Sequence, residues 1–161
     1  MHTDLIALAQ ALGKAALKQN ATVATAESCT AGGIAFMITE VAGSSDWFDR
    51  GFVTYSNRSK VELLGVKEAT LTAHGAVSEE TAAEMVLGAL AHSQADAAVA
   101  VTGIAGPGGA VPGKPVGTVF IGWGRRADAP QVKRFQFEGN RQAVRAQTVA
   151  EALKGLISLL S

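Results

Sequence analysis

The chain has 161 residues, 48% of them hydrophobic, which is enough to bury the core of one ordinary domain. Its 14 basic residues balance its 14 acidic residues, so no overall charge attracts a polyanion, and we expect neither nucleic acid nor a membrane as a partner. Apolar stretches stay below the roughly 20 residues that span a bilayer, no charged-then-apolar leader opens the sequence, and the single cysteine, Cys29, cannot form an internal disulfide. We therefore expect a cytoplasmic protein.

The first two thirds of the chain alternate between short strands and amphipathic helices. Helices are predicted from apolar spacing and capping residues for the segments 5–19, 34–41, 59–65 and 79–93. Strands are predicted for β-branched or alanine-rich segments between turn formers, at 21–28, 50–56 and 95–103. The last of these strands, ADAAVAVTG, is apolar almost throughout, which is typical of a strand covered by helices on both faces.

The last third of the chain begins with a predicted hairpin. Residues 115–124 and 131–139 are expected to pair as antiparallel strands, joined by the turn-prone sequence RRADAP. Asn140 is placed to cap a final helix that runs to about residue 159. Strands that alternate with helices and then pair as a hairpin predict an α/β fold: one three-layer α/β/α domain over residues 1–161, with a mixed, mostly parallel sheet.

Sequence motifs for cofactors and metals are incomplete or absent. Residues 108–114, GGAVPGK, have the spacing of a phosphate-binding P-loop, but Pro115 occupies the position of the magnesium-binding serine or threonine. No G-x-G-x-x-G follows the first strand, which disfavours a dinucleotide-dependent oxidoreductase. The three histidines are not spaced as metal ligands. We expect neither a cofactor nor a metal.

The segment AESCT, residues 26–30, places a serine, a cysteine and a threonine between a predicted strand and a predicted helix. The N–H groups of a helix's first turn point toward any anion or developing oxyanion at that place. Ser28 and Thr30 are therefore candidate substrate-binding residues. The alternative is that one of them only caps the helix, which is the commoner role for polar residues at such turns.

Arg141 and Arg145 lie one turn apart at the start of the final helix. Cations at that end oppose the helix dipole, at a cost of about 0.3 to 1 kcal/mol, so an anion is expected to compensate for them. A substrate phosphate fits two arginines. An ion pair with Glu138 or another carboxylate is the alternative.

The segment GSSDWFDRGFVTYSNRSK, residues 43–60, combines two serines with a tyrosine and a lysine. A serine hydroxyl attacks an amide only when a base takes its proton, and no histidine is near in sequence. Lys60 is the candidate base, provided that burial keeps its amine neutral, with Tyr55 as a proton relay. The spacing does not separate Ser44 from Ser45, and both serines also suit a polar connection between buried elements.

Four blocks, AESCTAGG, GSSDWFDRGFVTYSNRSK, VTGIAGPGG and KPVGTVFIGW, resemble in order and spacing the C-terminal domain of the CinA family, competence- and damage-inducible protein A. The resemblance covers nearly the whole chain, and Ala31 stands where many relatives have glycine. It implies an amidohydrolase that converts nicotinamide mononucleotide (NMN) to nicotinic acid mononucleotide and ammonia without a metal. The family's catalytic serine, tyrosine and lysine fall on Ser45, Tyr55 and Lys60. The further site residues that the resemblance implies are Ser28, Thr102, Gly103 and Arg141.

Two other interpretations stay open. Cys29 is an alternative nucleophile, with Glu27 and Lys60 as its partners, in a thiol-dependent amidase. The arginines and glycine-rich loops also suit a nucleotide-binding module without catalytic activity. We expect a homo-oligomer, with residues 115–123 as a candidate edge strand that seeks a partner.

Overall fold

The computed structural model of the chain describes residues 2–161. Its helices are α1 (His2–Lys18), α2 (Gly33–Thr39), α3 (Asn57–Leu64), α4 (Glu68–His74), α5 (Glu79–Ala91) and α6 (Arg141–Leu160). Its strands are β1 (Val23–Glu27), β2 (Phe48–Val53), β3 (Ala97–Gly103), β4 (Thr118–Arg125) and β5 (Gln131–Gln136). A short 3₁₀ turn, η1 (Ser44–Asp46), precedes β2.

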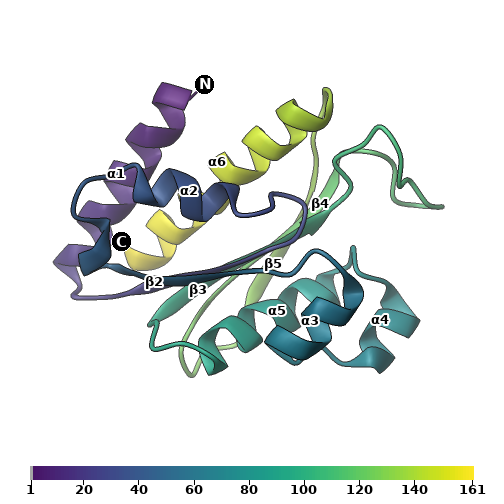
Figure 1. Cartoon of the computed structure of the whole chain (residues 1–161), viewed down its shortest axis with the longest axis horizontal. Helices are drawn as coiled ribbons and strands as arrows, with labels where there is room; N and C mark the ends of the chain where they lie inside the picture. Colours follow the sequence, from purple (N-terminus) through teal and green to yellow (C-terminus); the bar gives the residue numbers. More distant parts are fainter. Residues whose placement is uncertain (1) are drawn as a thin grey trace.

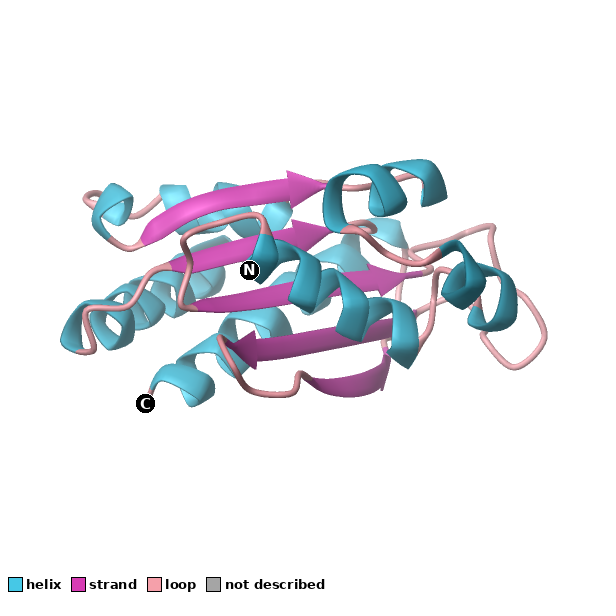
Figure 2. Ribbon diagram, turned by 90° about the horizontal axis from the view of Figure 1, so that it is seen from below, coloured by secondary structure: helices cyan, strands magenta, loops and turns pink. Residues whose placement is uncertain are grey.

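The strands form one mixed sheet in the order β2-β1-β3-β4-β5, with β4 running opposite to its neighbours (Figure 2). β1 pairs in parallel with β2 and β3, whereas β4 pairs antiparallel with β3 and β5. Helices α1, α2 and α6 cover one face of the sheet and α3, α4 and α5 cover the other (Figure 1). The three-layer α/β/α prediction is therefore confirmed, and the carboxyl ends of β1, β2 and β3 meet at the same end of the sheet.

The two faces of β3 carry the two halves of the core. Val99 and Val101 point into the cluster formed with α1, α2 and α6, while Ala98 and Ala100 point toward α5. All four side chains are fully buried, as expected for a strand with helices on both faces. Within residues 2–161, no helix is long and apolar enough to cross a membrane.

Capping residues mark the helix boundaries as the sequence predicts. Ser78 Oγ accepts a hydrogen bond from the N–H of Thr81 at 3.1 Å, and Asn140 Oδ1 accepts one from the N–H of Ala143 at 2.9 Å. Gly65 ends α3 in the left-handed region, with φ of 69°. These side-chain and backbone contacts satisfy groups that the ends of helices leave unpaired.

One expectation about the elements was wrong, and one helix was missed. The segment 115–123 does not supply an edge strand, because β4 lies between β3 and β5; the outer strands are β2 and β5. Most of β4 is buried, which agrees with its long apolar sequence. Helix α4 was not predicted: none of its residues is buried, so the sequence shows no apolar stripe there.

Candidate active site

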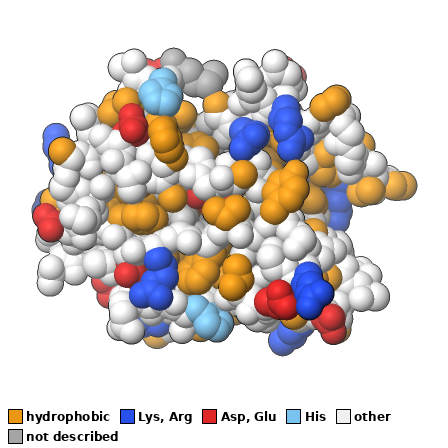
Figure 3. All heavy atoms as spheres, in the orientation of Figure 1, with side chains coloured by type: hydrophobic (Ala, Val, Ile, Leu, Met, Phe, Trp, Pro, Cys, Tyr) orange, Lys and Arg blue, Asp and Glu red, His pale blue; other side chains and the backbone are white. Residues whose placement is uncertain are grey.

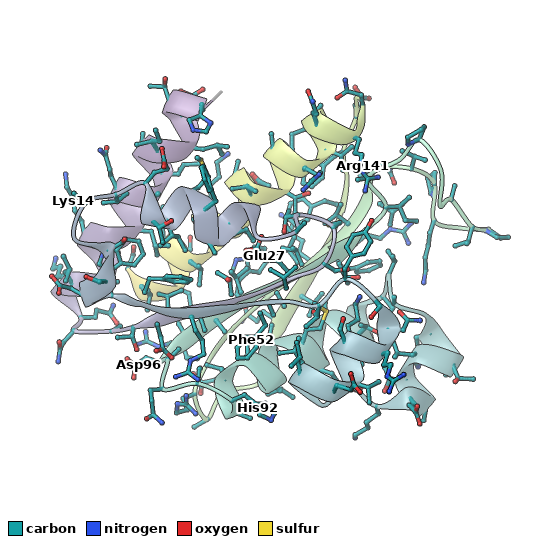
Figure 4. All side chains as sticks on the ribbon, viewed as in Figure 1. Lys14, Glu27, Phe52, His92, Asp96 and Arg141 are labelled. Carbon is teal, nitrogen blue, oxygen red and sulfur yellow. The ribbon has the colours of Figure 1, made fainter. Side chains whose placement is uncertain are left out.

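A hollow of about 280 Å³ lies at the carboxyl ends of β1 and β3, beside the connection from β2 to α3. This is the end of an open α/β sheet at which ligands usually bind. Figure 4 shows Arg141 at the start of α6 near this end, and Glu27 between α2 and the sheet. The hollow is lined mainly by Ser28, Cys29, Tyr55, Asn57, Lys60, Ala76, Val77, Thr102, Gly103, Arg141 and the loop 104–109.

Ser28 and Lys60 form the polar centre of the hollow. Lys60 lies in α3, is 1% exposed, and directs its Nζ to the Ser28 Oγ at 3.0 Å. The same Nζ donates to the carbonyl oxygens of Thr54 at 2.9 Å and Tyr55 at 3.1 Å. Ser28 follows β1 directly, and its N–H donates to the carbonyl of Val101 at 3.1 Å, which fixes the serine at the end of the β1–β3 ladder.

The surroundings of Lys60 favour a neutral amine. Burial lowers the pKa of its ammonium group below the ordinary value of 10.5. Within residues 2–161, no carboxylate lies within 4.0 Å of its Nζ to hold the positive charge. The carbonyls of Thr54 and Tyr55 can only accept hydrogen bonds, so a neutral amine directs its two N–H groups toward them and its lone pair toward Ser28. The arrangement can therefore take a proton from the serine hydroxyl.

Ser45 lies far from this pair. It belongs to η1, which precedes β2, whereas Lys60 follows β2. The strand from Phe48 to Val53 alone spans about 17 Å at about 3.3 Å per residue. A single chain therefore does not form the predicted pair of Ser45 and Lys60, because the full length of β2 separates them. Ser28 takes the place beside Lys60.

The buried thiol of Cys29 is not prepared for nucleophilic attack. Burial raises the pKa of Cys29 to about 12, so the thiol stays protonated near neutral pH. Glu27, its suggested partner, accepts hydrogen bonds from Thr30 Oγ1 at 2.5 Å and from the N–H groups of Ile34 at 2.8 Å and Ala35 at 3.0 Å. The carboxyl group of Glu27 therefore anchors the start of α2, and no hydrogen bond within residues 2–161 joins it to the thiol.

Arg141 and Tyr55 meet at the rim of the hollow. Arg141 donates through Nη1 to the carbonyl of Gly106 at 2.7 Å and through Nη2 to the hydroxyl of Tyr55 at 3.2 Å. Tyr55 is 61% exposed, and no hydrogen bond within residues 2–161 joins its hydroxyl to Lys60 or Ser28. The geometry places Tyr55 at the hollow, as predicted, but does not provide a relay to Lys60.

Arg145 supports the turn after β1 and does not line the hollow. Its Nη2 donates to the carbonyl of Thr30 at 3.2 Å. In the described part of the chain, neither Arg145 nor Arg141 lies within 4.0 Å of a carboxylate, so the alternative ion pair with Glu138 does not form. Thr30 is 2% exposed and its hydroxyl is bound to Glu27, which leaves Thr30 a positioning role.

Thr102 and Gly103, at the end of β3, line the hollow as expected. The hydroxyl of Thr102 donates to the carbonyl of Ala76 at 2.8 Å, which ties β3 to the segment before α5. A Cβ on Gly103 would approach the carbonyl oxygen of Thr118 at 2.8 Å and the Val119 side chain at 2.7 Å. Glycine is therefore required here so that β4 can pack closely.

Sequence reasoning missed three lining residues: Asn57, Ala76 and Val77. Ala76 and Val77 have no chemical signature, and Asn57 was hidden by its place at the start of α3. The role of Ser28 beside Lys60 was also missed. The signal for it was topological, since parallel neighbours β1 and β2 bring the residues after them to the same end of the sheet. No group of three metal-ligating side chains occurs in the described chain.

The model of the CinA C-terminal domain family matches residues 5–160 of the chain. The chain belongs to the CinA C-terminal domain family. Curated relatives of this CinA domain include the nicotinamide-nucleotide amidohydrolase PncC of Escherichia coli K12, 49% identical over 154 residues, or 96% of this chain and 93% of that protein. The protein of the same name from Pseudomonas putida is 54% identical over 154 residues, or 94% of each chain.

A solved structure confirms the fold of this CinA domain. The crystal structure of the competence/damage inducible protein CihA from Agrobacterium tumefaciens superposes with a TM-score of 0.95. The two chains are 46% identical, and the match covers 98% of this chain and 96% of that one. The family resemblance in the four sequence blocks is thus confirmed along almost the entire fold.

Proposed function

We propose that this CinA domain hydrolyses the carboxamide of NMN to nicotinic acid mononucleotide and ammonia, using Ser28 as the nucleophile. The observation that carries the proposal is the 3.0 Å contact between Ser28 Oγ and the buried Nζ of Lys60, inside a hollow with Arg141 at its rim. Two relatives at about half identity bear the name of this amidohydrolase, which supports NMN as the substrate.

The reaction proceeds in two stages with Lys60 as the proton carrier. The neutral amine takes the proton of Ser28 while Oγ bonds to the carboxamide carbon. The resulting ammonium gives its proton to the nitrogen of the substrate, the C–N bond breaks, and ammonia leaves. Water then attacks the ester with Lys60 again as the base, which releases the acid and restores the serine. The two carbonyls that Lys60 contacts keep its amine aimed at Ser28 throughout.

The loop 105–109 is the proposed holder of the oxyanion. The first-turn N–H groups of α2 are already taken, since Ile34 and Ala35 donate to Glu27 and Gly33 donates to Thr30. In the described chain, the N–H groups of the loop 105–109 donate no hydrogen bond, and most of the loop lines the hollow. Losing one oxyanion donor typically costs about 2.7 to 4 kcal/mol of barrier. These unpaired donors suit the charge that develops on the carboxamide oxygen.

Arg141 is the proposed anchor for the 5′-phosphate. Its guanidinium group has five N–H donors, of which the contacts to Gly106 and Tyr55 leave several free. It lies beside the hollow and has no carboxylate partner within residues 2–161, so a phosphate supplies the missing anion. Asn57 lines the same wall and is available to bind the ribose.

The proposal is tested by measuring ammonia release from NMN, nicotinamide riboside and free nicotinamide by the purified protein. We expect turnover of NMN, with kcat/KM for the riboside lower by about 10- to 150-fold, because charged hydrogen bonds to the phosphate contribute about 1.5 to 3 kcal/mol. Binding of NMN without ammonia release identifies a nucleotide-binding module and refutes the enzyme. Equal turnover of NMN and the riboside refutes the phosphate anchor.

A further inference from the structure

The glycine-rich loop 104–117, which joins β3 to β4, projects from the sheet beside the hollow (Figure 1). Except for Pro107, residues 104–109 line the hollow, and the side chains of residues 107–113 are exposed. Figure 3, in the same orientation, shows hydrophobic side chains at the outer end of this projection, where Val111 is 52% exposed. The outer part of the loop therefore has little apolar packing, and its position depends on polar contacts.

Two side-chain contacts tie the loop to α6 and to β5. Arg141 Nη1, at the start of α6, donates to the carbonyl of Gly106 at 2.7 Å. Arg134 Nη2, on β5, donates to the carbonyl of Gly113 at 2.7 Å. Neither contact connects the loop to the segment between α4 and α5, of which residues 76–77 also line the hollow.

Lys114 makes that connection. Its Nζ donates to the carbonyl oxygen of His74, the last residue of α4, at 3.0 Å. The last carbonyls of a helix have no partner within the helix, and a lysine ammonium group is a suitable donor for them. Within residues 2–161, no carboxylate lies within 4.0 Å of this Nζ. The contact with His74, which we call the Lys114 tether, is therefore what orients the lysine.

The segment that follows α4 is a fixed support for this tether. Thr102 Oγ1, at the end of β3, donates to the carbonyl of Ala76 at 2.8 Å. The carbonyl of Gly75 accepts from Ser78 Oγ at 2.9 Å and from Thr81 Oγ1 at 2.8 Å. These contacts join the segment to the sheet and to the start of α5, so the tether links an exposed loop to a rigid part of the fold.

The tether also explains the P-loop-like sequence GGAVPGK, residues 108–114. In a P-loop, the lysine reaches the phosphates that the loop surrounds. Here Lys114 does not line the hollow, and its ammonium group contacts the end of α4. The lysine therefore holds the loop in place and does not touch the substrate.

We propose that Lys114 is a positioning residue, whose tether holds the loop 104–117 at the hollow so that the free N–H groups within residues 105–109 meet the oxyanion of the carboxamide. The effect on rate rests on the proposed amidohydrolase function, whereas the tether itself does not. A displacement of about 1 Å at a reacting group can lower a rate by about 100-fold. Loss of the tether is therefore expected to slow the reaction without removing any group that contacts NMN.

The tether affects the transition state more than the binding of substrate. The negative charge on the carboxamide oxygen develops only during the reaction, so donors that are out of place lower kcat. The proposed phosphate anchor, Arg141, belongs to α6 and keeps its position without Lys114. A change in KM of no more than a few-fold is therefore expected when the tether is lost.

The effect on rate is tested by ammonia release from NMN in Lys114→Met, Lys114→Arg and the control Lys133→Met, since Lys133 is exposed on β5. We expect kcat to fall by about 10- to 100-fold in Lys114→Met, with KM within a few-fold of wild type. Lys114→Arg is expected to recover most of the rate, because a guanidinium group can donate to the same carbonyl. Lys114→Met at the wild-type kcat, or a loss that arginine does not reduce, overturns the positioning role.

The tether is tested without activity by limited digestion with elastase, which cleaves after small residues such as Ala110 in exposed loops. With all variants folded by circular dichroism, mass spectrometry should show cleavage after Ala110 several-fold faster in Lys114→Met than in wild type, Lys114→Arg and Lys133→Met. Equal cleavage rates in Lys114→Met and wild type overturn the tether. A wild type that releases no ammonia refutes the amidohydrolase instead, and the digestion then still decides the tether.

Discussion

The chemical role of Lys60 depends on its hydrogen-bond partners and on the lack of a carboxylate beside its amine within residues 2–161. Its Nζ contacts two carbonyls and one hydroxyl, and no carboxylate of residues 2–161 lies within 4.0 Å. A buried lysine with a carboxylate partner stays charged and inert as a base. In this environment, burial lowers the pKa of Lys60, and a neutral amine that donates to the two carbonyls turns its free electron pair toward Ser28.

The pH dependence of activity reports on Lys60. Its pKa is lowered from 10.5, so kcat/KM for NMN is expected to rise with pH through one ionisation whose apparent pKa lies below 10.5. Lys60→Arg is expected to lose activity at every pH, because a guanidinium group does not deprotonate in proteins. A Lys60→Arg enzyme with the wild-type profile would show that another group is the base.

The same shift makes stability depend on pH. Between the folded pKa of Lys60 and 10.5, the unfolded chain binds more protons than the folded chain, so this residue's contribution to the free energy of unfolding increases with pH across that window. In Lys60→Met, urea unfolding measured across this window should show a smaller increase of the free energy of unfolding with pH. An unchanged slope would mean that Lys60 is charged in the fold.

Replacing Arg141 separates binding from catalysis. Arg141→Ala is expected to raise KM for NMN by about 10- to 150-fold with little change in kcat, because the phosphate contact is equal in ground and transition states. The matched control is Arg58→Ala, since Arg58 is exposed and, within residues 2–161, forms an ion pair only with Glu62. An unchanged KM in Arg141→Ala removes its phosphate role.

At the level of single residues, the sequence predicted Lys60, Tyr55, Arg141, Thr102 and Gly103 at the hollow, and the structure places all five there. It did not predict that Ser28 contacts Lys60, because the two residues are 32 positions apart and meet only through the pairing of β1 with β2. Residue spacing predicts which side chains are neighbours on one helix or strand, but it does not predict contacts between different elements.

The first turn of helix α2 donates hydrogen bonds to a carboxyl group at the end of the preceding strand, β1. Glu27 accepts the N–H groups of Ile34 and Ala35 and the hydroxyl of Thr30, and it thereby fixes the turn that carries Ser28. Burial raises the pKa of Glu27 from 4.5, so its contribution to stability is full below pH 4.5 and declines as pH rises through the folded pKa.

Glu27→Gln tests this anchor. The amide nitrogen of glutamine cannot accept from the N–H of Ala35, so we expect a loss of about 1 to 3 kcal/mol in the free energy of urea unfolding at neutral pH. The control is Glu62→Gln, because the carboxylate of Glu62 forms an exposed ion pair with Arg58, and the loss of that pair should cost under about 1 kcal/mol. Equal stability of Glu27→Gln and wild type would contradict the anchoring role.

Helix α3, which carries Lys60, rests directly on α5. A Cβ on Gly88 would lie 2.0 Å from the carbonyl oxygen of Leu64, so the two helices touch through backbone. Gly88→Ala normally stabilises a helix by up to about 1 kcal/mol, but here it is expected to cost about 1 to 3 kcal/mol and to lower kcat by displacing α3. Thermal unfolding and NMN turnover measure both effects.

The neighbouring Leu87→Ala, on the exposed side of α5, serves as the control and should change neither property. A Gly88→Ala protein as stable and active as wild type would contradict the close contact of α3 with α5.

Among the elements, long segments with clear apolar spacing and caps were predictable, including α1, α5, α6 and the buried strand β3. The short elements η1 and α4 were not, since α4 buries no residue and η1 buries only Ser44. The position of β4 inside the sheet was missed because strand order depends on tertiary packing, although its nearly continuous burial agrees with its apolar sequence.

For the molecule as a whole, the sheet topology decides where chemistry is performed. Parallel β1, β2 and β3 deliver Ser28, the loop to Lys60 and Thr102 to one end of the sheet, and α6 begins with Arg141 at that same end (Figure 4). The other end of β2 holds Ser45.

The nucleophile is identified most directly by the rate of ammonia release from NMN in Ser28→Ala beside Cys29→Ala and wild type. If the hydroxyl of Ser28, activated by the amine of Lys60, is the nucleophile, Ser28→Ala is expected to lose about 10³-fold or more in kcat. Because the thiol of Cys29 stays protonated, the rate of ammonia release by Cys29→Ala is expected to stay within a few-fold of wild type. A Ser28→Ala enzyme within about tenfold of the wild-type rate, well short of the loss expected for a nucleophile, would contradict the assignment.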